Sequence, residues 1–112
     1  MILLSVHEAL DRIAEFDGRV VCIVGRLSLD FEDQCIDHIP AVEHREGGAY
    51  QSSIWVFFDH QRIDLPADQL RQFDRRHVVI EGRLSAPDPQ FGGCGHFSLW
   101  PAEILVTAMI KA

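Results

Sequence analysis

The sequence lacks most of the features that point to a membrane, to secretion or to catalysis. No apolar run approaches the roughly 20 residues that a membrane-spanning helix needs. The apolar residues 1–4 have no basic segment before them and no small-residue cleavage site after them, so we expect no secretory signal, with a mature secreted form as the alternative. The G-x-S-x-G, G-x-x-x-x-G-K and H-E-x-x-H motifs are missing too. We therefore expect a protein that is not an enzyme and needs no cofactor.

Cysteine and basic residues are scarce as well. Cys22, Cys35 and Cys94 are an odd number of cysteines at wide spacing, which is not a disulfide framework and favours a cytoplasmic location. One disulfide with a free thiol is the alternative. The net charge is −7, with 17 acidic residues against 10 basic ones. Such a chain lacks the field that attracts nucleic acid and suits a basic protein partner, unless its charge serves solubility alone.

One short sequence motif occurs twice in the chain. Residues 20–28 and 77–85 are both β-rich runs in which a glycine precedes Arg-Leu-Ser. A glycine inside a strand marks a bulge, a bend or a close backbone approach, and two such strands suit a small coiled barrel. At Gly25 the apolar positions change from even to odd numbers, so we expect a bulge that switches the buried face there. The positions concerned are Val20, Cys22 and Val24 before the glycine, and Leu27, Leu29 and Phe31 after it.

The remaining pattern predicts one domain over residues 1–112, with an N-terminal helix within 1–18 and a barrel over 19–110. Ser5 and Glu8 form a capping box at the start of that helix, and Gly18 stands where its C-terminal glycine belongs. Alternating apolar residues and turn residues then predict five strands and one short helix. The strands are expected at 19–31, 34–42, 51–59, 75–86 and 97–110, the last interrupted by Pro101, and the short helix at 66–73.

This order of elements resembles an OB-fold over residues 19–110. The resemblance rests on the long first strand bent at Gly25, the helix 66–73 between strands three and four, and residues 78–84 as the fourth strand. It implies an all-β, five-stranded Greek-key barrel with Leu27 and Leu84 in its interior. The closing segment 95–104 is also similar to the last strand of small uncharacterised bacterial OB-like proteins, a resemblance that brings no activity.

The resemblance also implies where a ligand would bind. In OB-folds the ligand lies across strands two and three, between the loop joining strands one and two and the loop joining strands four and five. Here these loops are 30–34, which is acidic, and 87–96, which contains the aromatic residue most expected to be exposed. We therefore predict a protein-binding module, such as an inhibitor or immunity-type protein that covers a basic site on its partner. The predicted partner-binding residues are Asp30, Glu32, Asp33 and Phe91.

A single-stranded nucleic-acid binder is the first alternative. It would need exposed aromatic side chains interleaved with basic ones. The candidates for stacking are Tyr50 and Trp55, and the candidates for phosphate contacts are Arg26 and Arg83. Core packing of the tryptophan and ion pairing of the arginines are the competing interpretations.

A structural zinc site is the second alternative. Cys35-x-x-His38 and Cys94-x-His96 would supply four donors from two pairs that lie near the two loops, although a one-residue Cys-x-His spacing is unusual for zinc. Buried free cysteines are the competing interpretation. Cys94 and His96 would also form a nucleophile–base pair, but no third group that would orient them is evident.

Overall fold

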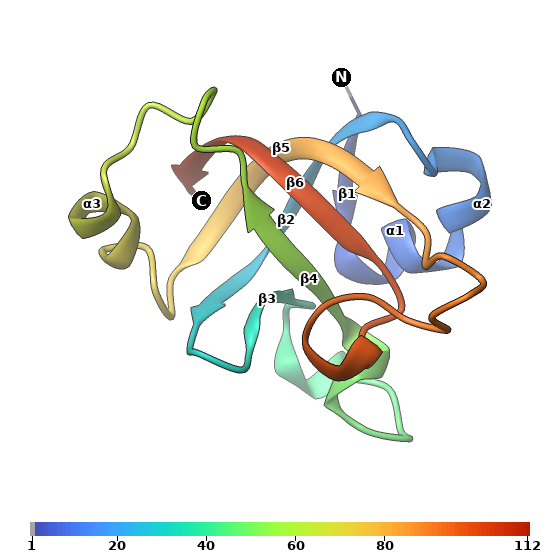
Figure 1. Cartoon of the computed structure of the whole chain (residues 1–112). Coiled ribbons are helices and arrows are strands. Elements are labelled where there is room, and N and C mark those ends of the chain that lie inside the picture. The colour runs from blue at the N-terminus through green and yellow to red at the C-terminus, as the bar shows by residue number, and fades with distance from the viewer. Residues whose placement is uncertain (1) are drawn as a thin grey trace.

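Five strands close into a β-barrel in the computed structural model, which describes residues 2–112 (Figure 1). The sheet order is β1-β2-β3-β4-β6-β5, and β2 also pairs with β5, which closes the ring. Strands β4 and β6 are parallel, whereas the other pairs within the ring are antiparallel. The strands are β1 (Leu3–Ser5), β2 (Val20–Leu29), β3 (Gln34–Asp37), β4 (Ser53–Phe58), β5 (His77–Ser85) and β6 (Glu103–Lys111).

This mixed barrel is compatible with the OB-like barrel that the sequence predicts, while the Greek-key path stays a prediction. Its helices are short, and α3 lies between β4 and β5 as expected. They are α1 (Val6–Asp11), α2 (Ile13–Phe16) and α3 (Ala67–Arg71), with the 3₁₀ turns η1 (Ala41–Glu43), η2 (Ala49–Ser52) and η3 (His96–Ser98). Within the described residues, no helix has the length and apolar character that crossing a membrane would require.

The N-terminal segment confirms the capping box but not one continuous helix. The Ser5 hydroxyl accepts a hydrogen bond from the Glu8 N–H at 3.1 Å, and the Glu8 carboxylate accepts one from the Ser5 N–H at 2.9 Å. The helix is interrupted at Arg12, which separates α1 from α2. Before it, the unpredicted strand β1 pairs in parallel with β2.

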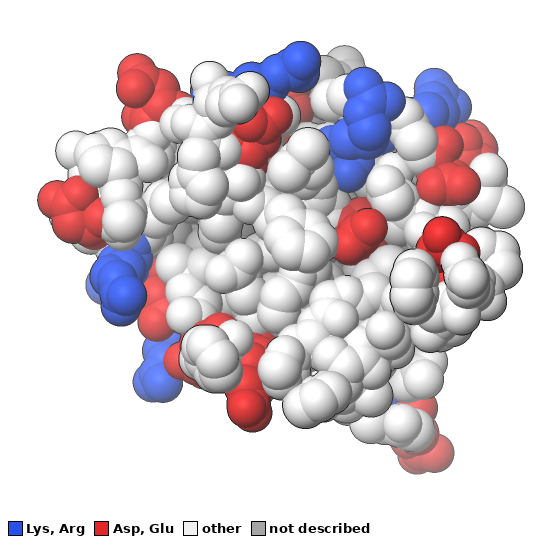
Figure 2. All heavy atoms as spheres, viewed as in Figure 1, with Lys and Arg blue, Asp and Glu red and all other residues white. Residues whose placement is uncertain are grey.

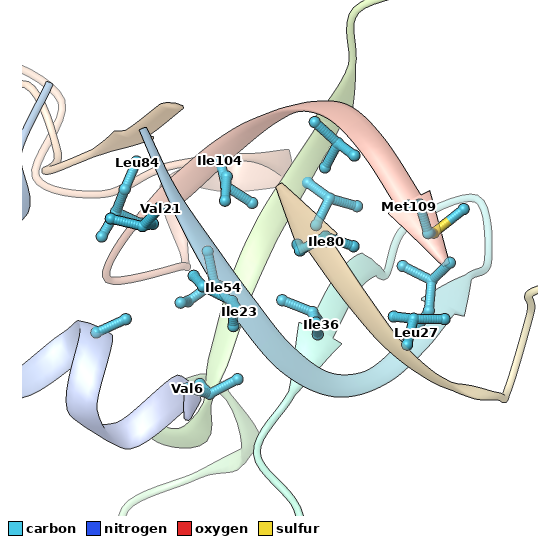
Figure 3. Close-up of a cluster of buried hydrophobic side chains, with 14 of the residues drawn as sticks. Val6, Val21, Ile23, Leu27, Ile36, Ile54, Ile80, Leu84, Ile104 and Met109 are labelled. Carbon is cyan, nitrogen blue, oxygen red and sulfur yellow. The ribbon is translucent and has the colours of Figure 1, made fainter. Parts of the chain in front are cut away.

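The barrel interior is almost entirely aliphatic. Leu27 and Leu84 are fully buried there, as expected, and Val6 closes the interior from α1. Figure 3 shows the interior side chains pointing towards one another from different strands. Ile23, Ile36, Ile54, Ile80 and Ile104 place one isoleucine in this core from each barrel strand.

The predicted switch of the buried face at Gly25 is wrong. Val21, Ile23, Gly25 and Leu27 all lie on the buried face of β2, without interruption. A Cβ atom at Gly25 would lie 2.6 Å from the carbonyl oxygen of Asp37, and one at Gly82 would lie 2.2 Å from that of Leu105. The two glycines therefore allow the neighbouring strand to approach closely. Of the bulge, the bend and the close backbone approach that a glycine inside a strand can mark, these two mark the close approach.

The switch of face occurs in β6 instead. Glu81 pairs with Ala108 and Gly82 with Val106, so Thr107 is the extra residue of a bulge. Because a bulge shifts the side-chain alternation by one residue, Met109 is buried after Val106, while Ala108 and Ile110 are exposed.

Two predicted strands are too long. β3 ends at Asp37 and not at residue 42, because Pro40 has no N–H to donate to a neighbouring strand. β6 begins at Glu103 and not at residue 97, since residues 96–98 form η3. Phe31, expected to continue the buried face of the first strand, is 92% exposed in the turn after β2.

Candidate binding site

A second, smaller cluster of buried side chains lies on the outside of the barrel wall. It consists of Cys35, Trp55, Cys94 and Trp100, with Tyr50 packed against it, and we call it the outer cluster. Its members on β3 and β4 point outward because their sequence neighbours Ile36 and Ile54 belong to the interior core. The β5–β6 loop folds back over this outer face, since its residues Cys94 and Trp100 pack in the same cluster as Cys35 and Trp55. Cys94 and Trp100 also exchange backbone hydrogen bonds within the loop.

The two tryptophans of the outer cluster are held differently. Their ring centroids lie 4.7 Å apart, and Tyr50 meets Trp100 edge-on at 4.8 Å. The Trp100 indole donates a buried hydrogen bond to the Ser53 hydroxyl at 3.0 Å. The Trp55 indole nitrogen is buried without a hydrogen-bond partner among the described residues. Trp100 is therefore the polar anchor of the loop, whereas Trp55 contributes packing.

The cysteines of the outer cluster are neutral thiols. Burial raises the pKa of Cys35 to about 12 and that of Cys94 to about 11. Since the thiolate is the nucleophile and the metal ligand, neither side chain is activated for catalysis. The arrangement of Cys94 therefore gives no support to a nucleophile–base pair with His96.

An acidic hollow of about 280 Å³ lies beside the outer cluster, on the outer face of β2 and β3. Three carboxylates line it, and no lysine or arginine does. The Asp37 carboxylate accepts a hydrogen bond from the Cys35 thiol at 3.6 Å. Such a hollow suits a cationic group whose apolar stem packs on an aromatic wall. Its acidic and aromatic lining residues are Asp30, Asp33, Asp37, Tyr50 and Trp100.

An aromatic ridge, formed by Phe31, His96 and Phe97, stands next to the acidic hollow. The ring centroids of Phe31 and His96 lie 6.4 Å apart, and those of His96 and Phe97 lie 4.0 Å apart. Glu32 approaches His96 to 3.9 Å, so the β2–β3 turn and the β5–β6 loop meet at this point. Phe97 is 77% exposed and has a φ of 57°, a backbone region that non-glycine residues seldom adopt.

The predicted partner-binding residues are all exposed. Asp30 and Asp33 line the acidic hollow, and Glu32 approaches the aromatic ridge. Phe91 is 66% exposed in the β5–β6 loop, as expected. The ridge residue Phe31 was missed, although its position between acidic turn residues is a signal of exposure that the sequence contains.

The predicted nucleic-acid residues do not form one surface. The antiparallel register of β2 and β5 pairs Arg26 with His77 but Val20 with Arg83, so the two arginines lie at opposite ends of the ladder. The Arg83 guanidinium donates to the carbonyl oxygen of Gly18. Trp55 is only 8% exposed and offers no face to a base, and Tyr50 lines the acidic hollow. The structure therefore does not bring the four residues proposed for single-stranded nucleic acid together.

The predicted zinc set is not brought together either. No three of Cys35, His38, Cys94 and His96 bring their ligand atoms within 4.8 Å of one another. The two cysteines lie in the outer cluster, whereas His38 contacts His7 and Glu43. Local sequence spacing suggested two pairs, but β3 ends between Cys35 and His38 and separates their side chains.

His7, His38 and Glu43 do lie within 4.8 Å of one another. The His7 N–H donates to Nδ1 of His38 at 3.2 Å, so the ring proton of His38 is on Nε2 and is donated to Glu43 at 2.7 Å. Both nitrogens of His38 are thus engaged, whereas a metal needs a free lone pair. His38 acts as an acceptor for a backbone N–H in the first turn of α1, where helices have no internal partner.

Comparison with known proteins adds no family. No family model matches the sequence, and the search of curated proteins returns no match. Among solved structures, "OBody AM3L09 bound to hen egg-white lysozyme" is 18% identical, covers 87% of this chain and 84% of that chain, and has a TM-score of 0.47. "OBody AM3L15 bound to hen egg-white lysozyme" is 19% identical, covers 87% and 79%, and has a TM-score of 0.48. At this similarity, the barrel assignment rests on the strand pairings of the chain itself.

Proposed function

We propose that this chain is a non-enzymatic binding module whose ligand is another protein with a basic surface. The observation that carries the proposal is the aromatic ridge beside the acidic hollow, with Phe31 between the hollow residue Asp30 and the ridge neighbour Glu32. Exposed aromatic side chains are the usual anchors of protein interfaces. The three carboxylates of the hollow add selectivity for lysine or arginine, because opposite potentials steer the encounter and suppress wrong partners.

The surface beyond the ridge supports a protein ligand. Phe57 and Leu105 are paired across β4 and β6, and each is about half exposed, as is Leu99 in the β5–β6 loop. Figure 2 shows that the centre of this face, over β4 and β6, is largely uncharged, with charged side chains around its margin. An apolar area with a polar rim is typical of protein interaction sites.

The specific form that we propose is an inhibitor that covers a basic site on its partner. Asp30, Glu32 and Asp33 would take the place of the anionic groups that such a site normally binds. The net charge of −7 supports this form, because it accelerates association with a basic protein. The neutral thiols of the outer cluster are consistent with a non-enzymatic role.

Affinity capture from the native host at low salt tests the proposal. The wild type and a control carrying Val42→Ala and Ile110→Ala, two exposed apolar residues outside the ridge, should capture the same protein. The Phe31→Ala, Phe97→Ala variant should lose it. The Asp30→Asn, Asp33→Asn variant should weaken capture and reduce its sensitivity to salt. Failure of the wild type to capture any protein would contradict the proposal.

A titration with mixed-sequence oligonucleotides at about 50 mM salt separates this function from nucleic-acid binding, because electrostatic binding is strongest at low salt. We expect no change in tryptophan fluorescence at high micromolar protein. Saturable binding of the oligonucleotide would contradict the protein-binding function.

A further inference from the structure

A second hollow lies on the same outer face as the acidic hollow and shares Asp37 with it. It has a volume of about 350 Å³. Its apolar lining is formed by Ile39, Pro40 and Ala41, and its other lining residues are Arg26, His38, His44 and His77. We call it the arginine hollow. The acidic hollow is thus lined by three carboxylates, whereas the arginine hollow has one guanidinium beside the shared carboxylate of Asp37.

The Arg26 side chain has no partner among residues 2–112. It lies in a row of cross-strand neighbours, with Asp37 opposite on β3 and His77 opposite on β5. Yet its guanidinium forms no hydrogen bond or ion pair with any described residue. The nearest expected partner, the Asp37 carboxylate, accepts from the Cys35 thiol at 3.6 Å. Residue Arg26 is half-buried, and the five N–H donors of its guanidinium are therefore available to an acceptor from outside.

The composition of the hollow selects the acceptor. A planar carboxylate matches the guanidinium fork with two parallel hydrogen bonds. A short aliphatic stem would pack on Ile39 and Pro40, and the imidazole of His77 stands beside the arginine in the row. A phosphate dianion fits less well, because it would meet the Asp37 carboxylate on the shared wall as well as the net charge of −7.

We propose that the arginine hollow binds a carboxylate on a short aliphatic stem. The origin of this carboxylate rests on the proposed function. It is the side chain of an aspartate or glutamate on the same partner protein whose basic side chain enters the acidic hollow. The two hollows together then bind a basic and an acidic residue of the partner side by side. The partner's orientation is set because the carboxylates and Arg26 lie in different hollows that meet at Asp37. A partner of basic residues alone would satisfy only one of them.

The first test uses this chain alone, with sodium butyrate as the probe. The imidazole resonances of the six histidines are followed by NMR at constant ionic strength, kept with sodium chloride. We expect saturable shifts for His44 and His77, and none for His60, which lines a different hollow beside α3. Shifts that do not saturate, or tighter binding of inorganic phosphate than of butyrate, would overturn the proposal.

Variants show whether Arg26 is responsible. Arg26→Gln should weaken butyrate binding on the order of tenfold or more, since charge-assisted hydrogen bonds contribute roughly 1.5–3 kcal/mol. Arg26→Lys, which keeps the charge and loses the fork, should lie between Arg26→Gln and the wild type. Arg62→Gln is the matched control, because Arg62 is exposed and paired with Asp59 elsewhere. Equal affinity of Arg26→Gln and wild type would overturn the proposal.

Partner capture separates this inference from the proposed function. If a partner is captured but Arg26→Gln captures it equally well, and butyrate does not bind, the arginine hollow is not a site while the binding module stands. If butyrate binds in an Arg26-dependent manner and no partner is captured, the hollow is confirmed as a carboxylate site and the proposed function fails.

Discussion

The barrel interior and the outer cluster are built from the same strands but from different chemistry. On β3 and β4, Ile36 and Ile54 face the interior core of buried hydrophobic side chains, whereas Cys35 and Trp55 face outward into a cluster of thiols and indoles. The interior is apolar, and the stability that it contributes depends on the buried apolar area and on how closely the side chains pack. In the outer cluster, individual polar contacts matter as well. The Trp100 indole has a hydrogen-bond partner, whereas the Trp55 indole has none among the described residues. The aliphatic core and the outer cluster thus lie on opposite faces of one barrel wall.

The largest effect should come from the interior. Leu84→Ala should lower the free energy of unfolding by about 2–5 kcal/mol, because it opens a cavity among fully buried side chains. Leu105→Ala is the matched control on the adjacent strand, where the side chain is about half exposed, and should cost less than about 1 kcal/mol. Urea denaturation measures both. Equal losses for the two variants would mean that the interior is not the principal source of stability.

The outer cluster should be sensitive to one hydrogen bond. Trp100→Phe leaves the buried Ser53 hydroxyl without its donor and should cost about 1–3 kcal/mol. Trp55→Phe removes an indole whose nitrogen has no partner among the described residues, so its cost should be smaller. The two free energies of unfolding, from the same denaturation experiment, give the comparison. If Trp55→Phe is the more costly change, packing and not the hydrogen bond holds the loop.

The thiols report whether the outer cluster opens separately from the barrel. With Ellman's reagent at about pH 8, half-buried Cys22 should react before Cys35 and Cys94, which are buried and whose pKa values burial raises to about 12 and about 11. Trp100→Phe should accelerate the labelling of Cys35 and Cys94 more than that of Cys22. Mass spectrometry assigns the labelled residue. Uniform acceleration of all three would show that the two regions open together.

The smallest effect should come from pH. Burial, then the neighbouring His38 and Arg45, lower the pKa of His7 below its ordinary value of 6.5. The unfolded chain then binds this proton more tightly than the folded chain, so stability is lost as pH falls below 6.5. His7→Gln should flatten that loss between about pH 7 and about pH 5. Glu103, whose pKa burial raises, contributes the opposite slope, so wild type and variant are compared at each pH. An unchanged slope would contradict the assignment to His7.

Elements with strong local patterns were predictable. The capping box at Ser5 and Glu8 and the existence and order of the five barrel strands follow from local spacing, although β3 and β6 are shorter than predicted. The position of the bulge was not, because residues 20–24 are apolar at every position and so leave the parity of the buried face open. β1 was missed for a similar reason, since three residues that pair with β2 have no periodicity of their own.

The candidate site was predictable in part. The resemblance placed the turn 30–33 beside the β5–β6 loop, and the contact between Glu32 and His96 confirms that placement. The repeated Gly-Arg-Leu-Ser suggested that Arg26 and Arg83 act together, but antiparallel pairing of β2 with β5 puts them at opposite ends. Identical local sequence therefore did not mean a shared surface.

The sequence by itself determined where the five barrel strands lie along the chain and that Leu27 and Leu84 fill a barrel, because the alternation of apolar residues is a property of short segments. Only the tertiary structure decided which residues meet in the two hollows and in the aromatic ridge. These surfaces join residues from turns and strands that are distant in the chain, such as Asp30, Tyr50 and Trp100. Their meeting depends on strand register and on the fold of the β5–β6 loop, and no pattern of neighbouring residues encodes either of them.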